Sequence, residues 1–209
     1  MRITGGRFRG RALKTARDGA KGYRPATAKV REALFSMLMA RGLDWDGACA
    51  LDVFAGSGAL GFEALSRGAA MALFMEKDRA AARIIEDNAR ALGVERQCKV
   101  FTGDAAALLA RGPYGVGLKA PAGILPAQVC FVDPPYGRDL LEPAVMALLD
   151  HGWLAPHALL AAEIEARLDL DPATLDPRLE PSADKTYGQT RIILWQHAIS
   201  PSIQAPSTL

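Results

Sequence analysis

Residues 129–139, VCFVDPPYGRD, place a carboxylate, two prolines and an aromatic ring directly after an apolar run. The residue before a proline is driven toward an extended conformation, so Asp133 and Pro134, which both precede a proline, are held stiff. Because Pro134 and Pro135 have no N–H, the local backbone presents mainly acceptors. We therefore predict a fixed cluster of two acceptors, the Asp133 carboxylate and the Pro134 carbonyl, beside the flat ring of Tyr136.

This cluster suits a planar heterocycle that carries an exocyclic amino group. The amine of guanine, adenine or cytosine is a poor nucleophile because its lone pair is delocalised into the ring. Hydrogen bonds from its two N–H groups to fixed acceptors favour a more pyramidal nitrogen, which can attack a sulfonium methyl. Losing one such preorganised group costs about 10²–10³ in rate. Tyr136 would stack on a base that has left its helix or loop. We therefore predict that Asp133, Pro134, Pro135 and Tyr136 form the catalytic cluster.

A second motif, LDVFAGSGALGFEAL, places Gly56, Gly58 and Gly61 between an expected strand and an expected helix. Glu76 follows twenty residues after Gly56, at the end of the next expected strand. Glycines at this spacing with a later acid are typical of a nucleotide cofactor site, where the acid binds the ribose. Asp104 ends a further expected strand.

A cofactor with an adenine, a ribose and a charged amino-acid tail would use all three strand ends. Glu76 would bind the ribose hydroxyls, Asp104 and Ala105 the adenine, and the glycine loop the tail. This description suits S-adenosylmethionine as well as NAD. The cluster at Asp133 favours methyl transfer, because a dehydrogenase has no evident use for it and no histidine stands where a hydride-transfer acid is needed.

The elements that must position these residues alternate from residue 48 onward. Near-continuous apolar runs predict buried strands, and the amphipathic runs between them predict helices, which together indicate a parallel sheet covered on both faces. The pattern indicates six strands, the last of them in YGQTRIILWQ without a following helix, and a further helix in RPATAKVREALFSMLMARG capped by Thr27. The glycine- and proline-rich residues 111–126 predict an inserted loop.

Composition bounds the class of protein. Half of the 209 residues are hydrophobic, which fits one globular domain. No apolar run approaches the roughly 20 residues that span a bilayer, and no apolar core follows the basic N-terminus, so we expect a cytoplasmic protein. Cys49, Cys98 and Cys130 lie far apart in apolar segments and predict buried thiols. The three histidines lack metal-ligand spacing, so no metal is expected.

The net charge of +2 hides a strong asymmetry along the chain. Residues 1–31 hold ten Lys and Arg against one acid, so they carry +9, and the remainder carries −7. A basic block on an acidic body is typical of a polyanion-binding protein, although a solvated N-terminal arm would look the same. Glycines at turn positions in MRITGGRFRGRAL indicate a small basic hairpin.

The motifs DVFAGSGALGFEALSRG, MEKDR, VDPPYG and MRITGGRFRGRAL…YRPATAKVREALF together resemble the RsmD family of bacterial methyltransferases, which act on guanine N2 of 16S ribosomal RNA. The resemblance covers residues 1 to about 196. It implies a Rossmann-like class I fold (α/β), with a mostly parallel seven-stranded sheet, an antiparallel last strand and helices on both faces. It implies S-adenosyl-L-methionine as the cofactor, and the small ribosomal subunit or an assembly intermediate as the partner.

The resemblance also assigns residues by position. The first cofactor motif would be Asp52 to Gly58, with contacts at Asp52, Phe54, Ala55, Gly56, Ser57 and Gly58. The segment RPATAKVRE would flank the cofactor through Arg24, Thr27 and Arg31. An RNA substrate would explain the basic block of residues 1–31. We predict that RNA phosphates bind Arg7, Arg9, Arg11 and Lys14.

We expect the chain to be a monomer with three parts: a basic RNA-binding arm (1–22), a methyltransferase domain (23–196) and a C-terminal tail (197–209).

Three alternative functions stay open. A DNA amino-methyltransferase shares the Asp-Pro-Pro-aromatic cluster, but it usually carries a separate recognition domain. A protein glutamine methyltransferase more often has Asn at position 133. A non-catalytic ribosome assembly factor would keep the basic arm without needing the rest.

Overall fold

The computed structural model describes residues 1–15, 28–118 and 126–198. The strands within these ranges are β1 (Cys49–Val53), β2 (Met71–Glu76), β3 (Cys98–Thr102), β4 (Ala127–Val132), β5 (Leu154–Glu165), β6 (Leu179–Tyr187) and β7 (Thr190–His197). The α-helices are α1 (Ala28–Ala40), α2 (Ala59–Arg67), α3 (Arg79–Leu92), α4 (Ala105–Leu109), α5 (Gly112–Gly115) and α6 (Leu141–Asp150). Two short 3₁₀ turns are η1 (Gly6–Phe8) and η2 (Glu95–Gln97).

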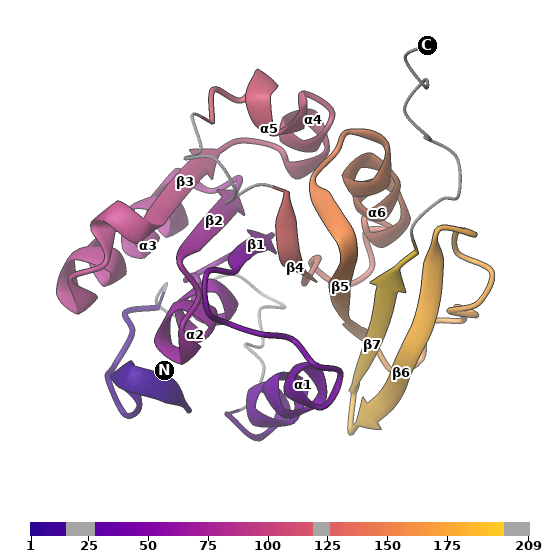
Figure 1. The fold of residues 1–209 in the computed structure, drawn as a ribbon, viewed down its shortest axis with the longest axis horizontal. Coiled ribbons are helices and arrows are strands. Elements are labelled where there is room, and N and C mark those ends of the chain that lie inside the picture. Colours follow the sequence, from indigo (N-terminus) through magenta and orange to yellow (C-terminus); the bar gives the residue numbers. More distant parts are fainter. Residues whose placement is uncertain (16–27, 119–125, 199–209) are drawn as a thin grey trace, which may run out of the picture.

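All seven strands form one sheet in the order β3-β2-β1-β4-β5-β7-β6 (Figure 1). Strands β1 to β5 pair in parallel, whereas β7 lies antiparallel to both β5 and β6. The chain builds outward from β1 through β2 to β3 and then returns to place β4 on the other side of β1. This arrangement confirms the predicted mostly parallel, seven-stranded α/β fold.

Strand β6 is the element that the residue pattern does not indicate. Its sequence, LEPSADKTY, is largely polar, and of its side chains Leu179 alone is fully buried. An edge strand is held on one side by backbone pairing, here with β7, and needs little apolar surface of its own. Hydrophobic periodicity therefore misses it, although the family resemblance supplies a seventh strand.

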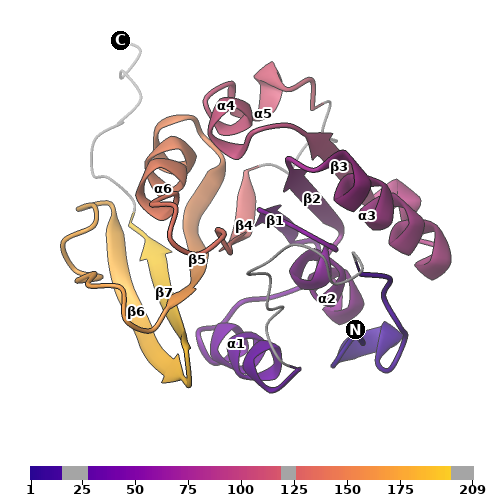
Figure 2. The ribbon, with the colours of Figure 1, turned by 180° about the vertical axis from the view of Figure 1, so that it is seen from behind.

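Helices cover both faces of the sheet, as Figures 1 and 2 show from opposite sides. Successive strand residues point to opposite faces, and the buried residues accordingly divide into two clusters. One cluster joins the sheet to α1, α2, α3 and the N-terminal segment, and the other joins it to α4 and α6. The three tryptophans lie in this core. Cys49 and Cys130 are buried as predicted, whereas the prediction is wrong for Cys98, which is partly exposed on β3.

Local signals position α3 firmly beside the site. The Asp78 side chain accepts a hydrogen bond from the Ala81 amide at 2.7 Å and so caps the first turn. Gly93 ends the helix in the left-handed conformation at φ +71°, as its position predicts. By contrast, the predicted loop 111–126 contains the short helix α5 and a buried Leu118, and its residues 119–125 lie outside the described ranges.

The N-terminal residues form a hairpin that is docked on the domain. Arg2 and Ala12 form an antiparallel bridge, and Ile3 and Leu13 are buried in the cluster of α1, α2 and α3. The buried Glu63 carboxylate of α2 accepts hydrogen bonds from the Thr4 amide at 2.9 Å, from the Thr4 hydroxyl at 2.7 Å and from the Gly5 amide at 2.7 Å. The predicted boundary at residues 22 and 23 lies outside the described residues.

Candidate active site

The predicted site residues gather at the carboxyl ends of four neighbouring strands. Asp52 lies within β1, Glu76 ends β2, Asp104 follows β3 by two residues, and Asp133 follows β4 directly. The strand order reverses between β1 and β4. In open parallel sheets this reversal leaves a crevice at the carboxyl ends, which is where ligands bind.

The glycine loop is held in place by Asp52, which lies in the strand that precedes it. This side chain is only 2% exposed, and its Oδ2 accepts a hydrogen bond from the Gly61 amide at 2.9 Å. Burial raises the pKa of Asp52 to about 8; the Gly61 hydrogen bond opposes the rise, and the negative charge of Glu76 adds to it. The structure therefore turns the Asp52 carboxyl into the loop, where it fixes the start of α2.

Positive φ angles set the shape of the loop. Phe54 has φ +64° and Gly58 has φ +79°, a conformation that is strained for a side chain such as that of Phe54. Gly61 is required for a different reason, since a Cβ there would lie 2.3 Å from a ring carbon of Phe74 in β2. Helix α2 can thus approach the sheet closely, which is the packing role of the third glycine in the motif.

The remaining loop positions are tied to neighbouring elements. The buried Ala55 donates its amide to the Met75 carbonyl at 3.0 Å. Ser57 is buried, and its carbonyl accepts a hydrogen bond from the Asn88 side chain of α3 at 3.1 Å. These contacts hold the loop in one conformation between β2 and α3.

Glu76 closes the loop from the side of β2. Its Oε2 accepts a hydrogen bond from the Gly56 amide, and its Oε1 accepts one from the Asp78 amide, both at 2.7 Å. The carboxylate is only partly buried, and each oxygen keeps a free lone pair. It can therefore accept further hydrogen bonds from hydroxyl groups, as a ribose would require.

Asp104 also serves the fold. It caps α4 by accepting a hydrogen bond from the Ala107 amide at 3.3 Å, and it pairs with the Lys77 ammonium at 3.3 Å. The capping hydrogen bond and the Lys77 charge hold the pKa of Asp104 below its usual value. Ala105, next in sequence, is buried in the core.

The Asp133 cluster lies on the other side of β1. The Asp133 amide donates to the Val53 carbonyl at 3.4 Å, so the backbone continues the β1–β4 ladder one residue beyond the strand. Pro134 is buried, whereas Pro135 and Tyr136 are exposed. Burial raises the pKa of the Asp133 carboxyl well above its usual range, and the charges of Glu163 and Asp52 raise it further.

Tyr136 offers an accessible ring above this cluster. Its side chain is 41% exposed, and its hydroxyl lies 3.3 Å from the Thr190 hydroxyl at the start of β7. Burial of part of the ring raises the pKa of Tyr136 above 10, so the phenol stays neutral at physiological pH. The ring is thus anchored at its hydroxyl while a large part of the residue stays exposed.

Sequence reasoning missed Glu163, at the carboxyl end of β5. It is 4% exposed, and burial raises its pKa to about 7 despite the opposing charge of Arg31. The sequence does contain a signal for it. In the run ALLAAEIE a carboxylate interrupts an apolar strand near its carboxyl end, where the other predicted site acids also lie.

The comparisons with known proteins agree with this geometry. The family model described as "Conserved hypothetical protein 95" matches residues 1–196. The chain belongs to this family. It is 38% identical to the "Ribosomal RNA small subunit methyltransferase D" of Escherichia coli, over 94% of this chain and 89% of that one. The protein of the same description from Haemophilus influenzae is 36% identical over 79% of each chain.

The fold also matches solved structures. The solved structure of yhhF from Escherichia coli superposes with a TM-score of 0.77 at 37% identity, covering 96% of this chain and 99% of that one. An RNA methyltransferase from Salinibacter ruber shares the fold at 16% identity, with a TM-score of 0.58, covering 87% of this chain and all of the other. The protein is therefore a methyltransferase with a Rossmann-like fold.

Of the three residues assigned to the RPATAKVRE segment, Arg24 and Thr27 lie outside the described residues. Arg31 is buried on α1, where its guanidinium donates to the Arg2 carbonyl at 2.8 Å and to the Met1 sulfur at 2.9 Å. Its charge also acts on Glu163. The structure therefore brings Arg31 to the hairpin and to the β5 side of the site, and its contact with a cofactor stays a prediction.

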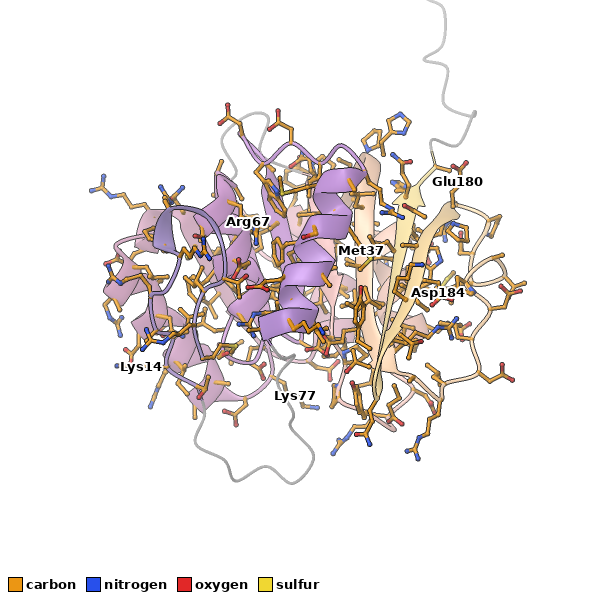
Figure 3. All side chains as sticks on the ribbon, turned by 90° about the horizontal axis from the view of Figure 1, so that it is seen from below. Lys14, Met37, Arg67, Lys77, Glu180 and Asp184 are labelled. Carbon is orange, nitrogen blue, oxygen red and sulfur yellow. The ribbon has the colours of Figure 1, made fainter. Side chains whose placement is uncertain are left out.

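The four predicted RNA-binding side chains are exposed on the hairpin. Three of them contact α3 or the turn after it: Arg7 donates to Gln97, Arg11 to the Ala91 carbonyl, and Lys14 pairs with Asp87 at 3.1 Å. The Arg9 side chain has no hydrogen-bond or ion-pair partner among the described residues, although its amide donates to the Gly6 carbonyl at 3.1 Å. Figure 3 shows Lys14 and the acidic Asp184 on opposite sides of α1.

Within residues 1–15, 28–118 and 126–198, no group of three or more His, Cys, Asp or Glu side chains could hold a metal ion. None of the helices in these same ranges is both long and apolar enough to cross a bilayer.

Proposed function

We propose that the chain transfers a methyl group from S-adenosylmethionine to the exocyclic N2 amine of a guanine in the RNA of the small ribosomal subunit. The observation that carries this proposal is the Asp133-Pro134-Pro135-Tyr136 cluster, which follows β4 directly beside the glycine loop of β1. Relatives named as ribosomal RNA small subunit methyltransferases support the class of substrate.

The residues present fit the proposed cofactor. Glu76 offers acceptor lone pairs at the end of β2 for the ribose hydroxyls, and Asp104 offers an ionised carboxylate at the end of β3 for the adenine amine. Gly58 and Gly61 let α2 pack closely against Phe74 of β2, so the glycine loop lies at the edge of the sheet where such cofactors bind. When bound, S-adenosylmethionine supplies an electrophilic methyl group on a sulfonium.

The chain's own groups then position and activate the amine. The Asp133 carboxyl and the Pro134 carbonyl accept the two N–H hydrogen bonds and so fix the direction of the nitrogen lone pair. Tyr136 stacks on the flipped base. Once the nitrogen is methylated its positive charge makes it acidic, and the extra proton passes to Asp133 or to water. Asp133 therefore needs no strong basicity at the start of the step.

The hairpin supports RNA as the partner. Arg7, Arg9, Arg11 and Lys14 project from a segment that Glu63 fixes to α2, so their charges have a defined place relative to the site. Their contacts with the protein are exposed and contribute little to stability, which leaves them available for phosphates. We expect the substrate to be the small subunit or an assembly intermediate, in the cytoplasm, with the protein acting as a monomer.

The first test is transfer of a labelled methyl group to small ribosomal subunits that lack the modification, followed by mass spectrometric mapping of the product. A single N2-methylguanosine in 16S RNA supports the proposal, and its loss in Asp133→Ala ties the reaction to the cluster. Label on adenine, DNA or protein would overturn the substrate. RNA binding without any label would favour the assembly factor.

A second test addresses the hairpin with one matched pair of variants. Arg9→Gln removes an exposed charge that has no partner among the described residues, and Arg111→Gln removes an exposed charge after α4, on the opposite face of the sheet from the hairpin. If Arg9 contacts a phosphate, Arg9→Gln lowers RNA affinity and reduces the slope of log affinity against log salt by about 0.7–0.9. Equal slopes in both variants would contradict the contact.

A further inference from the structure

Glu163 lies beside Asp133 at the carboxyl edge of the sheet. Val132 of β4 is paired with Ala162 of β5, so Asp133 and Glu163 occupy the next position on neighbouring strands. Phe131 and Ala161, two residues earlier, both pack in the cluster of α1, α2 and α3. Because strand side chains alternate, Asp133 and Glu163 face that same side of the sheet.

The charged surroundings of Glu163 come from three other elements. Asp133 and Tyr136 approach from the loop after β4, since the charge of Glu163 acts on both, and Asp52 of β1 acts in turn on Asp133. Arg31 of α1 acts on Glu163 from the helix layer. Glu163 therefore borders the same space as the predicted amine-binding cluster.

One oxygen of Glu163 is left unused by the protein. Oε2 is buried and has no hydrogen-bond partner among the described residues. A buried carboxyl oxygen without a donor is destabilising, and such groups are rare in folded proteins. A ligand with a second N–H donor next to its amine would satisfy this oxygen.

Guanine is the base with that pattern. Its ring N1–H stands next to the N2 amine, so two neighbouring groups donate. Adenine and cytosine instead present a bare ring nitrogen, an acceptor, next to their amine. A carboxyl oxygen opposite that position attracts guanine, and it meets a lone pair on the other two bases. A site that hydrogen-bonds a substrate N–H rejects analogues lacking it far more strongly than an apolar pocket does.

We propose that Glu163 is a specificity-determining residue, which accepts a hydrogen bond from guanine N1–H while Asp133 binds the N2 amine. This role rests on the proposed function, since it concerns the base that the same site methylates. Asp133 activates the amine, and Glu163 selects the ring that carries it.

The test uses 2-aminopurine, which keeps the exocyclic amine but lacks the N1 proton. Small subunits are reconstituted from RNA that carries guanine or 2-aminopurine at the mapped position, and single-turnover methylation rates are measured with the full chain and with Glu163→Gln. The wild type prefers guanine. In Glu163→Gln the preference falls about 10- to 100-fold, because the introduced amide can donate to the bare nitrogen and the lost hydrogen bond involves a charged group. Differences that both proteins share, such as the missing O6 of 2-aminopurine, cancel in this ratio.

Glu180→Gln is the matched control, because Glu180 is an exposed glutamate on the distant edge strand β6 (Figure 3), and it keeps the wild-type preference. If Glu163→Gln slows both substrates by the same factor, Glu163 supports the fold and the inference is wrong while the proposed function stands. If the wild-type protein methylates no guanine, the proposed function itself fails, and the role of Glu163 with it.

Discussion

The acids on the two sides of β1 are treated in opposite ways by the fold. On the cofactor side, Glu76 accepts two backbone amides, and Asp104 accepts one amide and an ammonium. On the target side, Asp133 and Glu163 occupy neighbouring register positions, the buried Oε2 of Glu163 has no donor among the described residues, and burial raises the pKa of both carboxyls.

This difference matches the two proposed roles, which are binding of the cofactor on one side and activation of the target amine on the other. Acids already supplied with donors are held in place, and they can accept further hydrogen bonds without reorganising. The paired acids are destabilised by each other, and a ligand with two neighbouring donors relieves that cost. We therefore expect the cofactor side to be complete before binding, and the target side to be completed by the base.

The largest effect is expected at Asp133. Asp133→Ala removes the main acceptor of the target side, and we expect the methyl-transfer rate to fall by about 10²–10³ or more. Affinity for S-adenosylhomocysteine, measured by calorimetry, stays within twofold because the cofactor side is untouched. Asp139→Asn alters an exposed acid of the same loop and keeps its activity. A strong loss of cofactor affinity in Asp133→Ala would contradict the separation into a cofactor side and a target side.

The second effect concerns stability and pH. The folded-state pKa of Glu163 is about 7, above the value of about 4.3 for an unfolded chain. Between these values the folded state binds more protons than the unfolded state, so the free energy of unfolding falls as pH rises. Glu163→Gln removes this contribution, and the fall between pH 5 and 8 shrinks by an amount on the order of 2 kcal/mol. Urea unfolding across this range measures it.

The control for the pH effect is again Glu180→Gln, which changes an exposed carboxylate and keeps the wild-type pH profile. A Glu163→Gln profile parallel to that of the wild type would show that Glu163 is ionised with an ordinary pKa. The paired acids would then be no different from those on the cofactor side.

The third effect is on cofactor affinity. Glu76→Ala removes the acceptor for the ribose and the two hydrogen bonds that hold Gly56 and Asp78. We expect affinity for S-adenosylhomocysteine to drop about 10-fold, the scale of one hydrogen bond to a charged group. Glu86→Ala, at an exposed position on α3, leaves the affinity unchanged. Unaltered binding in Glu76→Ala would remove this residue from the cofactor site.

The smallest effect is expected at Asp104. Asparagine caps a helix as well as aspartate does, and the exposed pair with Lys77 contributes under about 1 kcal/mol. Asp104→Asn therefore changes cofactor affinity no more than about fivefold, and the change shrinks at high salt. A loss larger than that of Glu76→Ala would show that the adenine contact dominates the site.

Most of the acids at this edge of the sheet were predictable from the sequence. The strand ends at Asp52, Glu76, Asp104 and Asp133 follow from alternating apolar and amphipathic runs, and the parallel sheet brings them to one edge. Glu163 was not predicted, because a lone acid in an apolar strand gains meaning only from its neighbour in register. Strand order and register depend on the whole fold, and short-range periodicity does not encode them.

The orientation of side chains was also beyond the sequence. The glycine motif indicates a ligand loop, yet it does not show that the Asp52 carboxyl turns inward to the Gly61 amide. In the same way, the basic N-terminus was equally consistent with a loose arm. Its docking depends on Glu63, a buried acid on α2 that looks like an ordinary surface position when the helix is read alone.

The docking of the hairpin also has a consequence during synthesis of the chain. The acceptors that hold Thr4 and Gly5 come from Glu63, and those that hold Lys14 come from Asn88, 74 residues later in the chain. Thr4, Gly5 and Lys14 therefore leave the ribosome before these partners, and they stay without them until α3 has been made. Since domains fold as units once enough chain is available, this strongly basic segment stays undocked during that interval, close to the RNA of the ribosome that makes it.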